Sequence, residues 1–487
     1  MTLKDILSGI EGLKAKGDLE IPIKGIAHNS KEVKEGYLFI ARKGFEVDGH
    51  MYIKDAIDNG AVAIMVQDVA SIKKEDIKPD IAIIATEDTR RDLAKVASNF
   101  YGNPASKLKL IGVTGTKGKT TVTFMIKAIL EKQGLKTGLI GTVANYIGSE
   151  NLGESERTTP DCADLQQLLK RMVKEEVEVV VMEVSSQSLK LNRVDTLKFD
   201  IGLFTNFSRD HISDHEHPTM EDYFDSKLKL FYMSKIGYIN TDDFRVAKIK
   251  KMELPCEIKT YGIDNAADLV AKDITVTNNA ADFKAKIGTR NERIKVGIPG
   301  RFSVYNALAA ICASLHFGLD SEKIKEALLD VRVPGRSELV SNKKDLCIMI
   351  DYAHSPESLE SILNATKSYT RGRVITVFGC GGDRDKTKRP LMGEASGAIS
   401  DFTIITSDNP RTEKPETIIQ EIEEGIKKTK GKYITIVDRT EAIKYAIEMA
   451  NKNDIIILAG KGHETYQEID GEKHPYDERE IVKRLTK

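Results

Sequence analysis

Short apolar runs alternate with amphipathic segments along most of this chain of 487 residues. An apolar run of roughly four to eight residues, bounded by glycine or charged residues, is typical of a buried strand in a parallel sheet. Segments 51–59, 122–133 and 220–231 instead have the spacing of helices. The alternation predicts an α/β protein with parallel sheets covered by helices. The predicted strands are 36–41, 62–66, 81–85, 108–113, 177–183, 199–205, 237–240, 346–351, 374–379, 402–406, 433–437 and 455–460.

Two turn-rich stretches divide this pattern into three expected domains. Tyr101-Gly-Asn-Pro104 precedes the strand at 108–113, and Val333-Pro-Gly-Arg336 precedes the strand at 346–351. We therefore predict an N-terminal α/β domain at residues 1–105, a central parallel-sheet domain at 106–334 and a doubly wound α/β domain at 335–487.

Composition narrows the classes of partner. The 73 Lys and Arg residues nearly cancel the 74 Asp and Glu residues, so bulk charge favours neither nucleic acid nor a membrane surface. No apolar run approaches the roughly 20 residues of a membrane span, and the N-terminus carries too many charges for a signal peptide. The five cysteines form no CxxC pair, which suits reduced thiols. We expect a cytoplasmic monomer that acts on small molecules.

The run Gly112-Val-Thr-Gly-Thr-Lys-Gly-Lys-Thr-Thr121 lies between a predicted strand and a predicted helix. Strand, glycine-rich loop and helix in this order indicate a phosphate-binding loop. The glycines let backbone N–H groups point at phosphate oxygens, Lys119 supplies a cation, and the Thr120 hydroxyl is a ligand for Mg²⁺. We therefore predict that the chain binds a nucleoside triphosphate.

This loop departs from the general phosphate-loop pattern, because Val113 stands five residues before Gly118 where a glycine is usual. Two other interpretations stay open at this point. The run could be a glycine-rich turn with a chance Lys-Thr pair, or it could belong to a switch or motor that only hydrolyses nucleotide. Turnover that depends strictly on an added amino acid would separate a ligase from the switch.

Glu183 and His211 each fall at or just past the end of a predicted strand, where ligands of parallel sheets collect. Lys227 lies four residues after Tyr223, on the apolar face of a predicted helix. A buried lysine is driven toward its neutral amine, which can take up CO₂ and become a carbamate, an anionic metal ligand. The plainer interpretation is that the stem of Lys227 packs while its ammonium reaches water.

A zinc site is a further alternative for this region. Its candidate ligands are Asp210, His211, Asp214, His215 and His217. They have no cysteine partner and follow a phosphate loop, so ligation of Mg²⁺ by one or two of them is the favoured interpretation.

Three predicted strands near the C-terminus end in polar loops, at 379–385, 407–411 and 460–464. If the sheet is parallel, the three loops share one edge. Arg384 and Arg411 would then offer guanidinium groups to carboxylates, and Glu464 would hold an ammonium, which together make a cage for a zwitterion. Each loop taken alone could instead be a surface turn with salt-bridged charges.

These blocks, in this order, resemble the Mur ligase superfamily, and within it the enzymes that add the third residue of the peptidoglycan stem peptide. The resemblance covers essentially the whole chain. The motifs that it rests on are Gly115-Thr-Lys-Gly-Lys-Thr-Thr121, Thr158-Thr-Pro160, Glu183-Val-Ser-Ser186, Phe204-Thr-Asn206, Asp210-His211, Lys227, Gly300-Arg-Phe-Ser-Val-Tyr-Asn306, Pro334-Gly-Arg336, Asp351-Tyr-Ala-His354, Asp408-Asn-Pro-Arg411 and Gly460-Lys-Gly-His-Glu464.

The resemblance implies a role for each motif. The ATP-binding residues would be Gly115, Thr116, Lys117, Gly118, Lys119, Thr120, Thr121, Asn306, Arg336, Asp351 and His354. The UDP-linked substrate would meet Ser30, Thr158, Thr159, Ser185 and Arg193. The amino acid would meet Arg384, Asp408, Asn409, Pro410, Arg411, Gly460 and Glu464. The catalytic residues would be Lys119, Glu183, His211 and Lys227, and two Mg²⁺ ions would be organised by Thr120, Glu183, His211 and carbamylated Lys227.

By the same resemblance, the three domains bind the UDP-sugar, ATP and the amino acid in turn. The implied activity is ATP-dependent ligation of meso-diaminopimelate to the D-Glu of UDP-N-acetylmuramoyl-L-Ala-D-Glu through an acyl phosphate, with release of ADP and phosphate. Arg411 favours this amino acid because a guanidinium fork reads the additional carboxylate that lysine lacks.

Two other ligases stay open as alternatives. The same ligase could add L-lysine, and folylpolyglutamate synthetase is a more remote possibility, against which Asp48-Gly-His50 and the motif at 408–411 argue. Departures from the family pattern are Asn29-Ser-Lys31, where Asp-Ser-Arg is usual, and Gln187, where His is usual. The first leaves the details of uridine recognition open.

Overall fold

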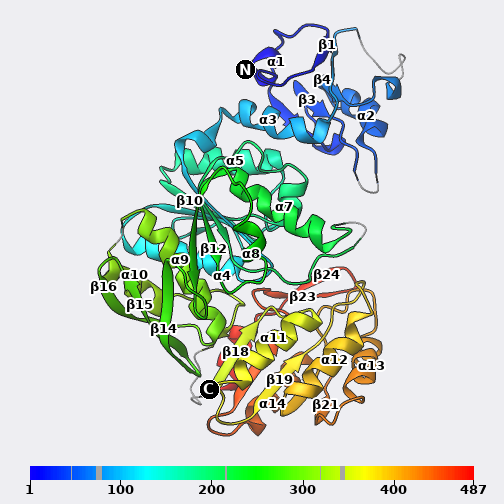
Figure 1. Ribbon diagram of the computed structural model, residues 1–487. Helices are drawn as coiled ribbons and strands as arrows, with labels where there is room; N and C mark the ends of the chain where they lie inside the picture. Colours follow the sequence, from blue (N-terminus) through cyan, green and yellow to red (C-terminus); the bar gives the residue numbers. More distant parts are fainter. Residues whose placement is uncertain (45–46, 73–78, 214–215, 319, 341–345) are drawn as a thin grey trace. The chain divides into compact units, whose positions relative to one another are not determined.

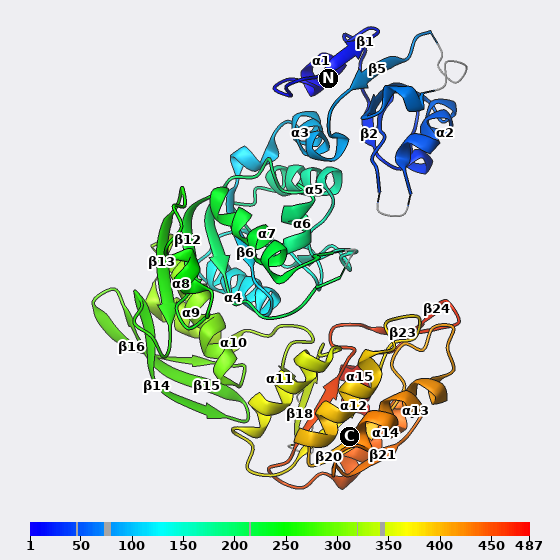
Figure 2. The ribbon, with the colours of Figure 1, turned by 45° about the vertical axis from the view of Figure 1, so that its right-hand side comes forward.

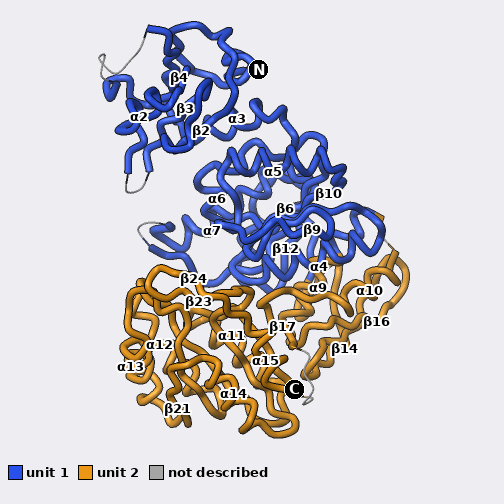
Figure 3. Tube along the Cα trace, turned by 180° about the vertical axis from the view of Figure 1, so that it is seen from behind, with its two compact units in different colours: residues 1–261, 312–317 blue, residues 262–311, 318–487 orange. Residues whose placement is uncertain are grey.

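The structure is a computed structural model that describes residues 1–44, 47–72, 79–213, 216–318, 320–340 and 346–487 (Figure 1). Asp214 and His215, considered above as metal ligands, lie outside this range. The chain forms two compact units, residues 1–261 with 312–317 and residues 262–311 with 318–487 (Figure 3). The domain limits expected from the sequence are a finer division and stay a prediction.

Unit 1 begins with a five-stranded sheet in the order β1-β5-β4-β3-β2. All pairs are parallel except β1 with β5. Both faces are apolar, as expected for a parallel sheet with helices packed on it. The strands are β1 (Lys14–Lys16), β2 (Gly25–Ala27), β3 (Tyr37–Ile40), β4 (Ala61–Val66) and β5 (Ala82–Ala85), and the helices are α1 (Leu3–Ile6), α2 (Ile53–Asp58) and α3 (Thr89–Tyr101).

Within unit 1 the strands of a second sheet follow the order β13-β12-β11-β6-β10-β7-β8-β9, parallel from β13 to β7. Its strands are β6 (Lys109–Thr114), β7 (Thr137–Ile140), β8 (Tyr146–Ile147), β9 (Glu150–Asn151), β10 (Val179–Glu183), β11 (Phe199–Phe204), β12 (Ser234–Asn240) and β13 (Glu257–Gly262). Its helices are α4 (Lys119–Lys132), α5 (Cys162–Lys174), α6 (Ser186–Lys190), α7 (Met220–Tyr232) and α8 (Val246–Ile249). The central strands β6, β10 and β11 are parallel neighbours and therefore direct their C-terminal ends to one edge.

Unit 2 contains an antiparallel meander that the sequence analysis did not predict: β14 (Leu269–Thr277), β15 (Ala280–Ile287) and β16 (Arg290–Val296) (Figure 2). Along β15 buried residues alternate with exposed lysines, so the strand lacks the continuous apolar run used for prediction. The helices that follow are α9 (Arg301–His316) and α10 (Ser321–Asp330).

The rest of unit 2 is a doubly wound sheet in the order β17-β18-β22-β19-β20-β21, parallel except for β17. Helices α11, α12 and α13 pack on the face that carries Met349, and α14 and α15 on the face that carries Ile348. The elements are β17 (Glu338–Leu339), β18 (Cys347–Asp351), α11 (Pro356–Lys367), β19 (Val374–Phe378), α12 (Lys388–Ile399), β20 (Phe402–Ile405), α13 (Pro415–Ile426), β21 (Tyr433–Thr435), α14 (Arg439–Met449), β22 (Ile455–Ala459), the hairpin strands β23 (Tyr466–Ile469) and β24 (Glu472–Pro475), and α15 (Glu478–Leu485). The predicted α/β fold class is confirmed.

Candidate functional site

The predicted phosphate loop joins β6 to α4 at the edge where the parallel strands end. Gly115 and Gly118 adopt φ angles of +143° and +85°, which L-residues avoid. A side chain at Gly115 would also overlap Thr205, whose Oγ1 lies 1.9 Å from the position of the added Cβ. No side chain of the described chain caps α4, and the N-terminus of a helix attracts anions.

Two lysine ammonium groups converge on the backbone of this loop. Lys119 Nζ donates to the carbonyls of Gly115 (2.9 Å) and Thr116 (3.1 Å), and Lys227 Nζ donates to the same Gly115 carbonyl (2.8 Å). Lys227 is 1% exposed, so the interpretation that its ammonium reaches water is wrong. Burial, with repulsion from Lys119, holds the pKa of Lys227 well below its ordinary value.

Glu183, the last residue of β10, links the phosphate loop to a neighbouring turn. Its Oε2 accepts hydrogen bonds from the hydroxyls of Thr120 and Thr142, both at 3.1 Å, and its Oε1 accepts one from the Thr142 N–H at 2.9 Å. The glutamate is 1% exposed. Carboxylate and hydroxyl oxygens are the donors that Mg²⁺ prefers, so Glu183 and Thr120 together suit the predicted metal site.

His211 lies beside an aromatic residue, Tyr223, that also neighbours Lys227. Its backbone is left-handed, with φ of +56°, and its Nδ1 lies 2.7 Å from Glu216 Oε2. The ring centroids of His211 and Tyr223 are 5.9 Å apart, and Lys227 Nζ lies 4.4 Å from the centroid of the same tyrosine. Tyr223 therefore lies beside His211 and Lys227, two of the four residues that the sequence assigned to the metal.

The zinc alternative finds no support in the described ranges, which hold no group of three or more His, Cys, Asp or Glu residues arranged for a metal. His217 is fully buried and places Nδ1 2.6 Å from Asp222 and Nε2 2.9 Å from Ser186, so both of its ring nitrogens have partners. Asp210 pairs with Lys117 at 3.1 Å. These contacts are those of a structural network around the phosphate loop.

Most residues expected at the UDP-linked substrate lie close to Glu183. Thr159 Oγ1 donates to the Glu183 carbonyl (2.9 Å) and accepts from the Ser185 N–H (3.1 Å), while Arg193 donates to the Thr159 carbonyl (3.3 Å). The Thr158 hydroxyl lies 3.1 Å from that of the threonine in the neighbouring turn. Ser30 is buried elsewhere in unit 1, at the start of a 3₁₀ turn, Ser30–Glu32.

Unit 2 holds the remaining residues expected at ATP. Asp351 ends β18 and accepts a hydrogen bond from the Ser337 N–H at 2.8 Å, and burial raises its pKa. The guanidinium carbon of Arg336 lies 4.6 Å from the ring centroid of Tyr352, and the His354 ring centroid lies 4.5 Å from it. Arg336 and His354 thus flank one aromatic ring. Asn306, also expected at ATP, is buried within α9.

The three C-terminal loops meet as predicted from their strand ends. Asn409 Nδ2 donates to Glu464 Oε2 at 2.8 Å, and the Gly382 N–H donates to the Asn409 carbonyl at 2.9 Å. The close approach leaves no room at two glycines: an added Cβ at Gly382 would lie 1.9 Å from the Pro410 carbonyl, and one at Gly460 would lie 2.6 Å from a carboxylate oxygen of the aspartate before Asn409. The loops therefore meet in one polar cluster, called the amino-acid pocket below after its expected ligand, rather than forming three separate surface turns.

The two predicted arginines of this pocket differ. Arg411 is 20% exposed along its side chain and is held by Glu468 (Nε to Oε2, 2.9 Å) and by the Gly382 carbonyl (2.8 Å). Arg384 is exposed on the loop after β19. Burial raises the pKa of Glu464, with Asp408 nearby adding repulsion.

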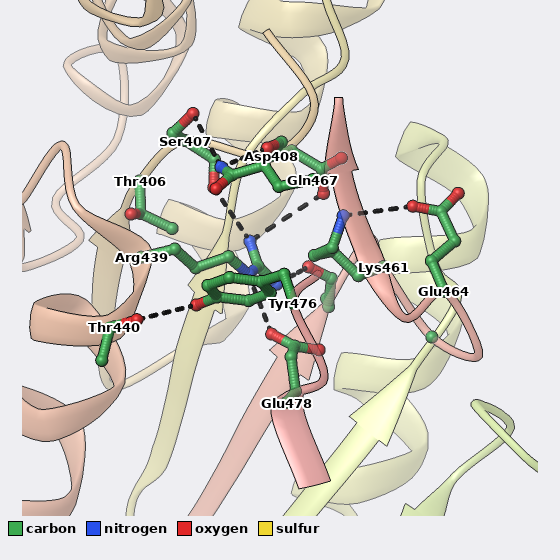
Figure 4. A network of polar contacts seen from close by, with 12 residues as sticks. Thr406, Ser407, Asp408, Arg439, Thr440, Lys461, Glu464, Gln467, Tyr476 and Glu478 are labelled. Carbon is green, nitrogen blue, oxygen red and sulfur yellow. Dashed lines mark hydrogen bonds and ion pairs between the residues drawn. The ribbon is translucent and has the colours of Figure 1, made fainter. Parts of the chain in front are cut away.

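Two buried cations in the pocket were not assigned a role by the sequence analysis. Lys461 is fully buried and donates to Asn409 Oδ1 (2.9 Å) and Glu464 Oε2 (3.2 Å). It stands inside the motif at 460–464, and that position was the only available signal. Arg439 donates from Nε to Glu478 (2.8 Å) and from another nitrogen to the last carbonyl of β22 (2.9 Å), as Figure 4 shows in part. Arg439 therefore links the end of β22 to the start of α15.

None of the helices in the described ranges has the length and apolar character needed to cross a membrane. Four of the five cysteines are buried and the fifth, Cys347, is partly buried.

Comparisons with known proteins agree with this site. Models of the Mur ligase middle domain, the Mur ligase glutamate ligase domain and the Mur ligase family catalytic domain match residues 113–314, 335–462 and 22–101. Two proteins named UDP-N-acetylmuramoyl-L-alanyl-D-glutamate--2,6-diaminopimelate ligase are similar over the full chain. The one from Caldanaerobacter subterraneus is 50% identical and covers 100% of this chain and 99% of its own, and the one from Clostridium botulinum is 46% identical and covers 100% of both.

A solved structure with the same printed name has a TM-score of 0.71 at 29% identity, covering 100% of this chain and 98% of its own. Both the sequence and the fold are thus similar from end to end. The chain belongs to the Mur ligase family.

Proposed function

We propose that this chain joins meso-2,6-diaminopimelate to the D-glutamate of UDP-N-acetylmuramoyl-L-alanyl-D-glutamate, as an ATP-dependent ligase of peptidoglycan precursor synthesis. The observation that carries the proposal is the convergence of three strand-end loops on one charged pocket containing Asn409, Arg411 and Glu464. Family membership supports ATP-dependent ligation, and both relatives above carry this substrate pair in their names.

A carboxylate and an amine do not condense in water unless the acid is activated. ATP, when bound, supplies the phosphoryl group that converts the D-glutamate carboxylate into an acyl phosphate open to attack by the neutral amine. The residues of the chain contribute positioning and charge. Lys119 and the N–H groups at the start of α4 would neutralise phosphoryl oxygens, and Arg336, Asp351 and His354 would hold the nucleotide within unit 2.

The residues around Glu183 fit a divalent cation. Thr120 and Glu183 offer hard oxygen donors, and His211 and Lys227 both lie beside Tyr223. A carbamate on Lys227 would keep one N–H for the Gly115 carbonyl and would place negative charge beside Lys119, replacing the repulsion of two cations by attraction. Mg²⁺ held here would stabilise charge on the transferring group.

The protein would recognise both ends of the amino acid. Arg411 retains N–H groups for the additional carboxylate of diaminopimelate, and Glu464 would bind an ammonium. An L-lysine-adding ligase is the alternative, and Arg411 argues against it because lysine offers no carboxylate there. The UDP-linked substrate is assigned to Ser30, Thr158, Thr159, Ser185 and Arg193, and the monomeric state and cytoplasmic location remain predictions.

One experiment tests the proposal. The protein is incubated with ATP, Mg²⁺ and UDP-N-acetylmuramoyl-L-alanyl-D-glutamate, and single amino acids are screened for phosphate release and for the ligated product. We expect meso-diaminopimelate to support turnover and L-lysine to be poorer by about 10²-fold, as expected when a buried polar partner goes unmet. Phosphate release that does not depend on any amino acid would contradict a ligase.

A further inference from the structure

The hairpin β23–β24 is joined closely to the segment that carries Arg411. The Arg411 N–H donates to the Glu468 carbonyl at 3.0 Å, and the Asp470 N–H donates to the Arg411 carbonyl at 2.8 Å. The Glu468 N–H donates to Asn409 Oδ1 at 3.0 Å, and Gln467 Nε2 donates to the Asp408 carbonyl at 2.6 Å. Four hydrogen bonds therefore tie β23 and the turn that follows it to the pocket segment.

These hydrogen bonds hold the backbone of Arg411 in a conformation that is unfavourable for a non-glycine residue. Its φ is +51°, in the left-handed region, where a non-glycine residue is strained by about 1 kcal/mol. The hydrogen bonds to the hairpin on both sides of Arg411 compensate for this strain. The direction in which its side chain leaves the backbone therefore depends on the hairpin.

The hairpin also holds the guanidinium itself. Glu468 Oε2 accepts from Arg411 Nε at 2.9 Å, and the Gly382 carbonyl accepts one N–H of Nη1 at 2.8 Å. A guanidinium has five N–H groups, so three of them, on Nη1 and Nη2, have no acceptor within the part of the chain that the structure describes. Glu468 thus binds the rear of the fork and leaves its two-nitrogen end for a planar anion.

We infer that Glu468 is a positioning and specificity-determining residue, which aims the Arg411 fork at the distal carboxylate of the amino-acid substrate through the β23–β24 hairpin. The inference rests on the proposed function and goes beyond it by assigning selectivity to a residue outside the strand-end loops. A fork fixed at its rear loses less side-chain entropy when a carboxylate binds. Substrates without that carboxylate gain nothing from this alignment, so Glu468 acts on the preference between substrates.

The test compares Glu468→Ala and Glu468→Gln with the wild type, with steady-state kinetics for meso-diaminopimelate, L-lysine and ATP. We expect Glu468→Ala to raise KM for diaminopimelate about tenfold and to lower the preference over lysine by a similar factor. KM for ATP should stay unchanged. Glu468→Gln should stay close to the wild type, since an amide oxygen also accepts a hydrogen bond from Nε. Glu472→Ala, on the exposed strand of the same hairpin, is the matched control and should change none of these constants.

Other outcomes would overturn the inference. If Glu468→Ala lowers KM for diaminopimelate, the glutamate competes with the substrate for Arg411. If its KM values for diaminopimelate and ATP rise together, or if none changes, Glu468 has only a structural role or no role. A wild type that uses lysine as well as diaminopimelate contradicts the proposed function itself, and that result is read before any variant is compared.

Discussion

The phosphate loop in unit 1 and the amino-acid pocket in unit 2 differ in the groups that their buried and half-buried lysine and arginine side chains contact. In the loop, Lys119 and Lys227 both donate to the carbonyl of Gly115. In the pocket, each buried or half-buried cation has a carboxylate partner: Arg411 with Glu468, Lys461 with Glu464 and Arg439 with Glu478.

The difference corresponds to the ligands proposed for each region. A polyanion is attracted by the ammonium of Lys119, which donates to backbone carbonyls that carry no net charge, and the attraction grows as charge develops during phosphoryl transfer. A zwitterion has no net charge, so a balanced pocket selects it by the placement of each charge. We therefore expect substitutions in the loop to reduce the catalytic rate, and substitutions in the pocket to change which amino acid is used.

The largest effect is expected from Lys227→Ala. Loss of the proposed carbamate would remove support for Mg²⁺, which is worth several kcal/mol, so kcat should fall by about 10³-fold. Small carboxylic acids should partly restore activity, measured as phosphate release. Lys229→Ala, on the exposed side of the same helix, is the control. Near-normal turnover by Lys227→Ala, with or without bicarbonate, would remove this lysine from the mechanism.

Lys119→Ala should follow, with a loss of about 3 kcal/mol of transition-state stabilisation, or roughly 10²-fold in kcat. The pKa of Lys227 should also rise toward its ordinary value, because a repelling cation is gone. Kinetics with varied ATP separate the two possible roles. If kcat is kept and only KM for ATP rises, Lys119 stabilises bound nucleotide and the contrast with the pocket is weakened.

Arg411→Ala should act on preference rather than rate. The variant should lose the advantage of diaminopimelate over lysine, expected at about 10²-fold, because both substrates then lack a partner for the distal group. Competition between the two amino acids in one reaction, with products separated by mass, measures the ratio directly. An unchanged ratio would mean that the ion pair of Arg411 with Glu468 serves only to hold its turn.

The phosphate loop and the pocket also differ in how much of each could be predicted from the sequence. The phosphate loop is contiguous in the sequence, and its role depends on a backbone geometry that Gly115 and Gly118 indicate. Convergence of the three loops of unit 2 followed from the expectation of a parallel sheet, because C-terminal ends of parallel strands share an edge. The predicted strands of the parallel sheets were recognised because both of their faces are buried.

The features that were not predicted depend on partners far away in the sequence, or on strands whose buried residues do not form a continuous apolar run. Glu468 lies 57 residues from Arg411, and Glu478 lies 39 residues from Arg439, so neither pairing leaves a local pattern. Strands β14–β16 interrupt their buried positions with exposed polar or charged side chains, as at Lys284 and Lys286, and so contain no continuous apolar run. The burial of Lys227 was anticipated, but its bond to the Gly115 carbonyl required the folded chain.

The smallest effect is a pH dependence confined to the pocket. Glu464 must be ionised to hold an ammonium, and burial raises its pKa, with Asp408 adding repulsion. As pH falls through this raised pKa, Glu464 gains a proton, so kcat/KM for diaminopimelate should fall, by about tenfold per pH unit at the acid end. The profile is measured from about pH 5 to about pH 8, with kcat/KM for ATP as the reference.

Glu464→Gln separates this group from other acids of the protein. The variant should bind diaminopimelate more weakly at neutral pH, since its amide carries no charge for the ammonium, and its acid limb should flatten. An acid limb that is the same in Glu464→Gln and wild type would assign the titration to a different carboxyl group. In that case the charge balance in unit 2 would serve folding rather than recognition, and only the phosphate loop would respond to the charge of its ligand.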